Sequence, residues 1–260
     1  MKEKNLILFK SMNFQDIINS EHKMLMEAED KYNKHFKNCI NFVSLTQDFI
    51  SEVKMESWVF NALLAYIRKY LLLSFFSALR LHHVQSFANL RQVLEGTSMA
   101  CYALAFPEIK NFITIDQDNV ARNSTIIEKN KHYKWLEQNY PDASLVIKKT
   151  KEDFINKTCA HCSLVYTIQH FQMNDSSFEF SFFDKDDLDL VKGDLWLIGH
   201  TAGNLMDIFY GINKNYKLLT FSDNFIKRLT NLRKENEEIR EEMKNKPRFK
   251  KWSDKLNKTQ

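Results

Sequence analysis

The sequence contains little glycine and proline, only five and three among its 260 residues. These residues supply the turns that many-stranded sandwiches, barrels and phosphate-binding loops need. Their scarcity argues against those folds and favours long helices with few breaks. Because 44% of the residues are apolar and 13% aromatic, there is enough material for one hydrophobic core. We therefore predict a mainly all-α protein, a bundle of about six to seven helices.

Cysteine is also scarce, and long uncharged apolar runs are missing. The four cysteines lack the density of a secreted disulfide scaffold, which favours reduced thiols. The apolar run at residues 6–9 is too short for a signal peptide. Residues 62–81 are the most apolar stretch, but Arg68, Lys69 and Arg80 interrupt it, which indicates a buried helix rather than a membrane span. We expect a cytoplasmic protein with no membrane partner.

Apolar spacing predicts the helices and one exception to them. A proline at position 107 should end one helix, and Asp116 or Asp118 can cap another. The pattern changes to alternation at Phe178, Phe180 and Phe182, which predicts a β-hairpin over about 164–183 whose apolar face lies against the helices or a second subunit. Helices are expected over 13–51 (one or two), 62–81, 83–105, 116–139, 141–162, 186–212 and 225–243, within a single domain spanning 1–243.

Two features of the last third concern packing and partners. Gly199 and Gly203 are four residues apart, a spacing that allows close helix approach. Apolar residues from Phe225 to Met243 form a heptad-like seam, which either packs within the bundle or pairs with a second copy; a homodimer is expected. Residues 244–260 form a basic tail, which either is solvated or binds nucleic acid or anionic lipid.

A first polar group is expected around the second and third helices. It consists of Arg80, His82, His83, Arg91 and Glu95, and all of these except His82 are taken as candidate ligand-binding residues. Arg91 and Glu95 are four residues apart and can touch on a helix. The group is interpreted either as a salt-bridged seam that fixes helix register or as an anion-binding pocket.

Two further groups contain histidine. Cys159, His161 and Cys162 include one Cys-x-x-Cys, but structural zinc needs four ligands and there is no second such pair. No glutamate stands at metalloenzyme spacing from a histidine, so neither a metal nor a cofactor is expected. His200 shares a helix face with Asn204 and Asp207, which suits either solvent exposure or an acid/base role. His161 and His200 are the candidate catalytic residues.

Two patches carry a resemblance to known proteins. Residues 75–95, with the pattern Leu-Arg-x-x-x-Glu, and residues 154–163 resemble segments of a family of uncharacterised bacterial all-helical proteins. That family is remotely similar to the HEPN helical bundles, many of which are ribonucleases of toxin and antiphage systems. Their signature, Arg followed by His after four to six residues, does not occur here; Asn156 and His161 are the nearest match. The resemblance implies a protein directed at nucleic acid or nucleotides.

Two functions follow as hypotheses. In the first, RNA or a nucleotide is the ligand, His161 or His200 acts as acid or base, and Arg91 holds a phosphate. In the second, the protein is a non-enzymatic interaction or regulatory module, in phage defence or a toxin system, that binds a protein partner. In that case the hairpin and the last helix present the partner surface. Whether the protein is an enzyme is left open by these residues.

Overall fold

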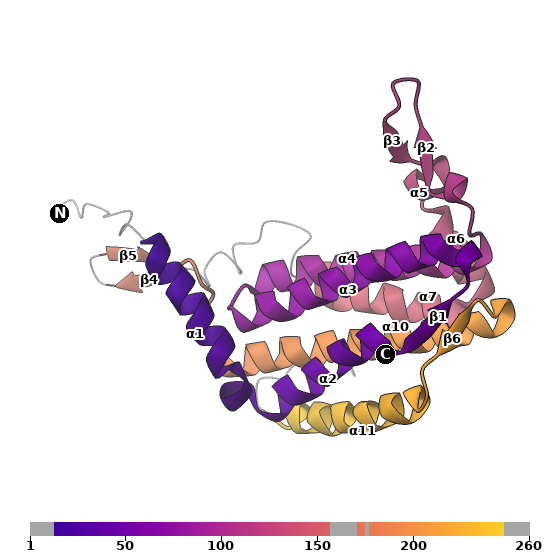
Figure 1. The fold of residues 1–260 in the computed structure, drawn as a ribbon. Helices are drawn as coiled ribbons and strands as arrows, with labels where there is room; N and C mark the ends of the chain where they lie inside the picture. The colour runs from indigo at the N-terminus through magenta and orange to yellow at the C-terminus, as the bar shows by residue number, and fades with distance from the viewer. Residues whose placement is uncertain (1–12, 157–170, 175–176, 247–260) are drawn as a thin grey trace, which may run out of the picture.

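The computed structural model describes residues 13–156, 171–174 and 177–246. Its long helices are α1 (Phe14–Tyr32), α2 (Lys34–Asp48), α3 (Trp58–Leu79), α4 (His83–Ala105), α10 (Leu188–Tyr216) and α11 (Phe225–Lys244). Figure 1 shows α2, α3, α4, α10 and α11 running alongside one another, whereas α1 projects at an angle from one end. The predicted all-α bundle with an inserted β-hairpin is therefore confirmed.

Helices α3 and α4 form the central hairpin. Phe60, Leu64, Ile67 and Leu71 recur every three or four residues along α3 and are almost fully buried, which accounts for its place in the core. Helix α4 ends at Ala105, before Pro107, as the sequence predicts. By length and composition, residues Met55–Leu79 could also cross a membrane, but the core helix of a bundle passes the same test.

Helix α10 lies against α2, and two glycines permit the close contact. A Cβ at Gly203 would meet Phe42 Cε1 at 2.9 Å, and one at Gly199 would meet Phe42 Cδ2 at 3.1 Å. The ring of Phe42 is almost fully buried. The expectation of close packing at these glycines is confirmed, and the partner helix is α2.

Helix α11 packs on α2 and α10 through its apolar seam. Phe225, Leu229, Ile239 and Met243 are buried, as is Asn236 in the middle of the seam. Of the two alternatives for this seam, packing within the bundle is the one observed. The last helix therefore offers no apolar dimer face along these residues.

The predicted hairpin is present as β4 (Phe171–Asn174) and β5 (Ser177–Phe180), paired antiparallel with Phe171 opposite Phe180. The side chains of Phe178 and Phe180 lie outside what the structure describes. Phe182, after the hairpin, is 40% exposed and contacts His82 edge-on.

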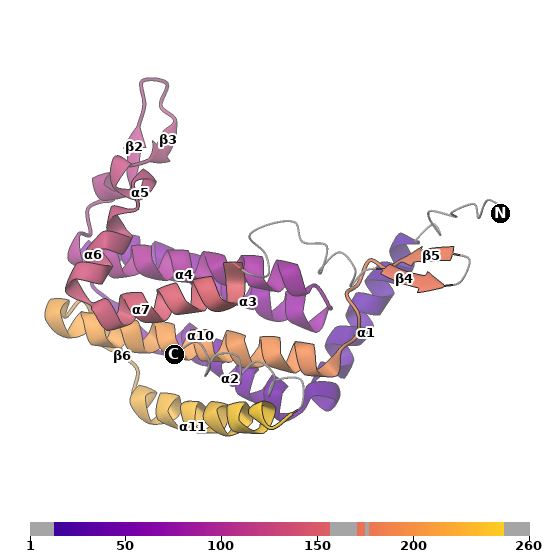
Figure 2. The same cartoon turned by 180° about the vertical axis from the view of Figure 1, so that it is seen from behind.

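Two further strand pairs were not predicted. Strands β2 (Ile113–Ile115) and β3 (Ala121–Asn123) form a hairpin that protrudes from the bundle in Figures 1 and 2. Strand β1 (Ile50–Val53) pairs with the distant β6 (Leu219–Phe221).

The helix expected from Asp116 or Asp118 to residue 139 is corrected by the structure. Asp116 Oδ1 accepts hydrogen bonds from the backbone N–H groups of Asp118 and Val120, so it stabilises the turn of a hairpin instead of a helix start. Helical structure begins later, in α5 (Thr125–Glu128), capped by Ser124, and α6 (Lys131–Asn139).

The helix expected from Pro141 to 162 is described as far as residue 156. It consists of α7 (Pro141–Lys149) followed by a π-helical segment at Thr150–Ile155. Short 3₁₀ turns at Met55–Ser57 and Ile109–Asn111 complete the described elements. Cys159, His161 and Cys162 lie outside the described residues, as do tail residues 247–260.

Candidate functional site

His83 is held by two buried aspartates at the start of α4. Its backbone N–H donates to Asp184 Oδ2 at 2.5 Å, and its Nδ1 donates to Asp194 Oδ2, also at 2.5 Å. All three residues are buried. Asp184 thus supplies the acceptor that an N-cap side chain would otherwise provide, and Asp194 ties α10 to α4.

Arg80 lies in a separate ion-pair network with α1. Its Nη1 is 3.3 Å from Glu21 Oε2, and Nε2 of His82 is 3.1 Å from Glu21 Oε1. This network attaches the projecting helix α1 to the turn between α3 and α4.

Arg91 and Glu95 meet as predicted, and Lys151 joins them. Glu95 Oε1 accepts from Arg91 Nε and from Lys151 Nζ, both at 3.0 Å. Burial raises the pKa of the Glu95 carboxyl, but the two cationic donors outweigh it and the pKa is lowered. The network joins α4 to the π-helical segment, as the register-fixing interpretation requires.

Two groups beside this network have no hydrogen-bond partner in the described structure. The buried Tyr133 hydroxyl is one, and Nδ1 of His132 is the other. Lys151 Nζ lies 5.2 Å from the centroid of the Tyr133 ring. Burial lowers the pKa of His132 to about 4, so this imidazole is neutral at pH 7.

His200 lies between α10 and α11. Its ring stacks on Trp196 with centroids 5.1 Å apart, and its Nε2 is 3.1 Å from Asn204 Nδ2. Arg233 donates to Asn204 Oδ1 and forms an ion pair with Asp207. Burial, and after it the charges of Arg233 and Arg240, lowers the pKa of His200 to about 4.

The predicted polar group is thus divided among different contacts. Arg80 faces α1, His83 faces α10, and Arg91 with Glu95 faces the π-helical segment, while His200 contacts α11. The described residues show no contact between Arg91 and His200. A catalytic role for His200, and for His161 outside the described residues, stays a prediction.

Sequence reasoning missed His35, which lies in the first turn of α2. Its side chain is buried, with 6% of its surface exposed, and neither ring nitrogen has a hydrogen-bond partner among the described residues. Burial, and after it the charges of Lys192, Lys34 and Lys246, lowers the pKa of His35 to about 4. The ring therefore lies where α2, the first turns of α10 and the end of α11 bring positive charges together.

The backbone at this place also has free donors. Asn33, the N-cap of α2, has φ 47° and makes no capping bond through its side chain. Within the described residues, no hydrogen bond is made by the backbone N–H groups of Lys34, His35 or Phe36. A helix start with free N–H groups carries partial positive charge and suits an anion.

The lysines around His35 differ in their pairing. Lys34 forms an ion pair with Glu242, and Lys246 with Asp189. Lys192 has no acidic partner in the part of the chain that the structure describes. We call His35, Lys192 and the free N–H groups of α2 the α2 anion site. In the sequence, an asparagine before Lys34-His35 was its one visible signal.

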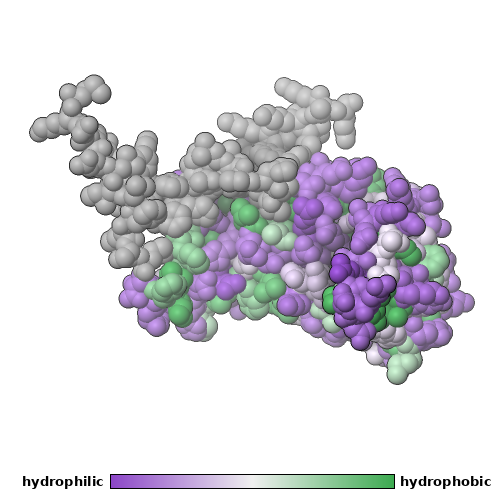
Figure 3. All heavy atoms as spheres, turned by 90° about the horizontal axis from the view of Figure 1, so that it is seen from above, coloured by the Kyte–Doolittle hydropathy of each residue, from purple (hydrophilic) through white to green (hydrophobic). Residues whose placement is uncertain are grey.

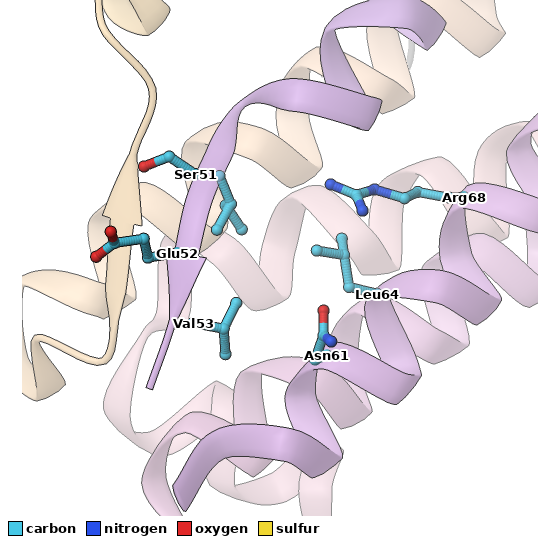
Figure 4. A pocket seen from close by; sticks show the side chains of 7 residues that line it. Ser51, Glu52, Val53, Asn61, Leu64 and Arg68 are labelled. Atoms are coloured by element: carbon cyan, nitrogen blue, oxygen red, sulfur yellow. The ribbon is translucent and has the colours of Figure 1, made fainter. Parts of the chain in front are cut away.

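A pocket of about 240 Å³ lies elsewhere, between β1 and α3. Figure 4 shows Arg68 and Asn61 on α3 on one side, and Val53 of β1 on the other. Arg68 Nε donates to the Thr46 carbonyl at 2.7 Å. The sequence had marked Arg68 only as a charge within an apolar stretch.

No protein-family model, curated protein or solved structure matches the chain.

Proposed function

We propose that this protein is directed at nucleic acid and holds an RNA phosphate at the α2 anion site. The observation that carries the proposal is a buried histidine, His35, at a helix start without a side-chain cap; within the described part of the chain neither His35 nor the nearby Lys192 has a partner. A phosphate there would accept from the free N–H groups and from one nitrogen of the neutral imidazole. It would satisfy donors that otherwise cost free energy to bury.

The charge distribution along the sequence favours a polymer over an isolated anion. Lys246, whose charge acts on His35, is followed by Arg248, Lys250 and Lys251. Cations that follow one another along the chain can neutralise successive phosphates and release their counterions. The basic tail would then extend the contact that begins at the helix.

Binding is tested by fluorescence anisotropy with a labelled single-stranded RNA at several salt concentrations. Lys192→Ala should weaken binding and reduce the slope of log K against log salt by about 0.7, the value for one phosphate contact on a single strand. Lys227→Ala is the matched control, because Lys227 is exposed at the opposite end of α11. Equal slopes of log K against log salt for wild type and Lys192→Ala would show that RNA does not bind at the α2 anion site.

Cleavage is a separate question and needs its own assay. Because its pKa is lowered to about 4, His200 is neutral at pH 7 but would be only a weak general base, since a general base works best with a pKa near the operating pH. Labelled RNA should be incubated without added metal with wild type, His200→Ala and His161→Ala. Loss of cleavage in a folded variant would name the acid or base, and intact RNA in every reaction would leave binding as the only activity.

A second candidate function, an interaction module, is favoured by α1. This helix carries an exposed apolar stripe four and eight residues apart, with Phe14 83%, Ile18 58% and Met26 71% exposed. Figure 1 shows α1 standing away from the bundle. A second copy of this chain could pair its own stripe with this one in an isologous contact, as expected for a homodimer.

The dimer is tested by light scattering after size-exclusion chromatography. Wild type should have twice the mass of the monomer, and Ile18→Glu should return it to the monomer mass because the charge would be buried in the contact. Val120→Glu, on the exposed β2–β3 turn, is the control. A monomeric wild type at high concentration would argue against this candidate.

Seen from above, hydrophobic residues are interspersed among hydrophilic ones on the surface of the protein (Figure 3).

A further inference from the structure

The pocket between β1 and α3 contains one arginine whose terminal nitrogens are available. Arg68 is half-buried, and its Nε is committed to the Thr46 carbonyl. No hydrogen bond from its Nη1 or Nη2 is found among the described residues. Burial lowers the pKa of Arg68, with Asp48 opposing, yet a guanidinium stays charged in proteins. The hydrogen bond to the Thr46 carbonyl fixes the guanidinium plane. The free edge of this group, formed by Nη1 and Nη2, is therefore preorganised for a ligand.

The opposite wall of the pocket is formed by β1, where the aliphatic side chains of Ile50 and Val53 flank Ser51 and Glu52. The register of β1 against β6 shifts between Ile50 and Glu52. Ile50 and Val53 line the pocket with Leu64 of α3. In Figure 4, Val53 points toward α3, whereas the Glu52 carboxylate points to the other side of the strand, away from Arg68. Arg68 therefore faces the aliphatic side chains of Ile50 and Val53, with the Glu52 carboxylate turned away and Asp48 as the acidic residue whose charge acts on it.

Asn61 adds one neutral polar group. It lies two turns before Arg68 on α3, and in Figure 4 its amide points toward the space between α3 and β1. An amide can donate to an anion without adding charge. The pocket thus combines one fixed cation, one amide and an aliphatic surface.

We propose that this pocket binds a small aliphatic monocarboxylate. The free edge of Arg68 offers two parallel N–H groups, which match the two oxygens of a carboxylate. The side chains of Ile50, Val53 and Leu64 suit a short branched aliphatic group on the ligand. A volume of about 240 Å³ limits the ligand to a small molecule or the last residue of a peptide. A phosphate dianion would meet only one positive charge here and an aliphatic wall on its other side.

The probes are isovalerate, its neutral isostere isovaleramide, and the tripeptide Gly-Gly-Val, which presents the same carboxylate at a chain end. Binding to the full-length protein is measured by calorimetry. Isovalerate or the tripeptide should bind with a Kd on the order of 1 mM, as suits so few atoms, and the tighter of the two identifies the source of the carboxylate. Isovaleramide should bind at least tenfold more weakly, and any heat from inorganic phosphate should be unchanged in Arg68→Lys, because the α2 anion site lies elsewhere.

Two variants locate the binding. Arg68→Lys loses the two-point contact and should weaken binding at least tenfold. Because Arg68 also holds Thr46, Asn61→Asp is the second variant; Asn61 is exposed, and a carboxylate placed there repels the ligand. Lys69→Ala, exposed next to Arg68, should bind as wild type. No heat from either carboxylate with folded wild type, or wild-type affinity in Asn61→Asp, would overturn the proposal.

Discussion

His83 and His35 are both buried histidines in the first turn of a helix, and their surroundings differ. At the start of α4, Asp184 accepts from the backbone and Asp194 from the ring of His83. At the start of α2, neither the ring of His35 nor the first backbone N–H groups have a hydrogen-bond partner in the part of the chain that the structure describes. Neither helix is capped by the side chain of its own N-cap residue. The difference teaches that acidic residues from distant elements complete one helix start and leave the other open to an external anion.

The largest effect is expected from removing Asp194, the acid that accepts from the ring of His83 at the start of α4. Asp194→Ala leaves His83 Nδ1 buried without its acceptor, and we expect a loss of about 3–5 kcal/mol of unfolding free energy. Urea unfolding followed by circular dichroism measures it. His35→Leu is the matched variant and should change stability by less than about 1 kcal/mol, because no hydrogen bond is lost. Similar losses of unfolding free energy in both variants would contradict the difference in bonding between His83 and His35.

Acid should destabilise the protein through three histidines that are neutral at pH 7, of which His35 and His132 are buried and His200 is half-buried. The pKa values of His35, His132 and His200 are lowered to about 4, below the ordinary value near 6.5. Between these pH values the unfolded chain binds more protons, so stability is fully present above about pH 6.5 and falls as pH drops toward 4. Between pH 7 and pH 5 the expected loss is about 2 kcal/mol for a fully buried histidine with this shift, and less for the half-buried His200.

The pH effect can be assigned to His35 by substitution. Unfolding free energies at pH 7 and pH 5 should differ less in His35→Leu than in wild type. His22→Gln, on the exposed face of α1, should leave the difference unchanged. An identical pH dependence in wild type and His35→Leu would show that the His35 ring is not buried as described.

The close contact of α2 with α10 brings His35 near Lys192, and glycine makes it possible. Gly203→Ala places a Cβ within 2.9 Å of Phe42, and we expect a loss of about 1–3 kcal/mol from overpacking. Gly211→Ala, on the same helix with nothing within 4 Å, should gain about 0.5–1 kcal/mol from helix propensity. Thermal unfolding compares the two, and a stabilised Gly203→Ala would contradict the packing.

The smallest expected effect is stabilisation by an anion. Inorganic phosphate at about ten times its Kd should raise the unfolding free energy by about 1.4 kcal/mol. The rise should disappear in Lys192→Ala and persist in Lys227→Ala. A rise that is equal in all three proteins would place the anion elsewhere.

Local signals predicted several elements well. Helix α4 has the predicted bounds because Pro107 acts on the residue beside it. The alternating phenylalanines predicted the β4–β5 hairpin. The β2–β3 hairpin was missed because an aspartate can begin either a helix or a turn, and the residues around Asp116 do not distinguish the two.

The candidate site could be predicted only in part. The pair of Arg91 and Glu95 follows from helical spacing, but its third member, Lys151, comes from another segment. The pairing of His83 with Asp194 and the pocket between β1 and α3 depend on segments distant in the sequence. The apolar spacing within one segment does not indicate which distant segment will pack against it.

The residues alone specify the helical class, the main helices and the apolar seam of α11, because few glycines and prolines and a regular apolar spacing act over short distances. The tertiary structure decides which charges are paired. His83 has an acidic partner because α10 crosses α4 at Asp194, and His35 has none because the elements around it bring mainly lysines. Since a buried polar group costs free energy unless it is bonded, this difference in pairing determines where the protein can receive an anion.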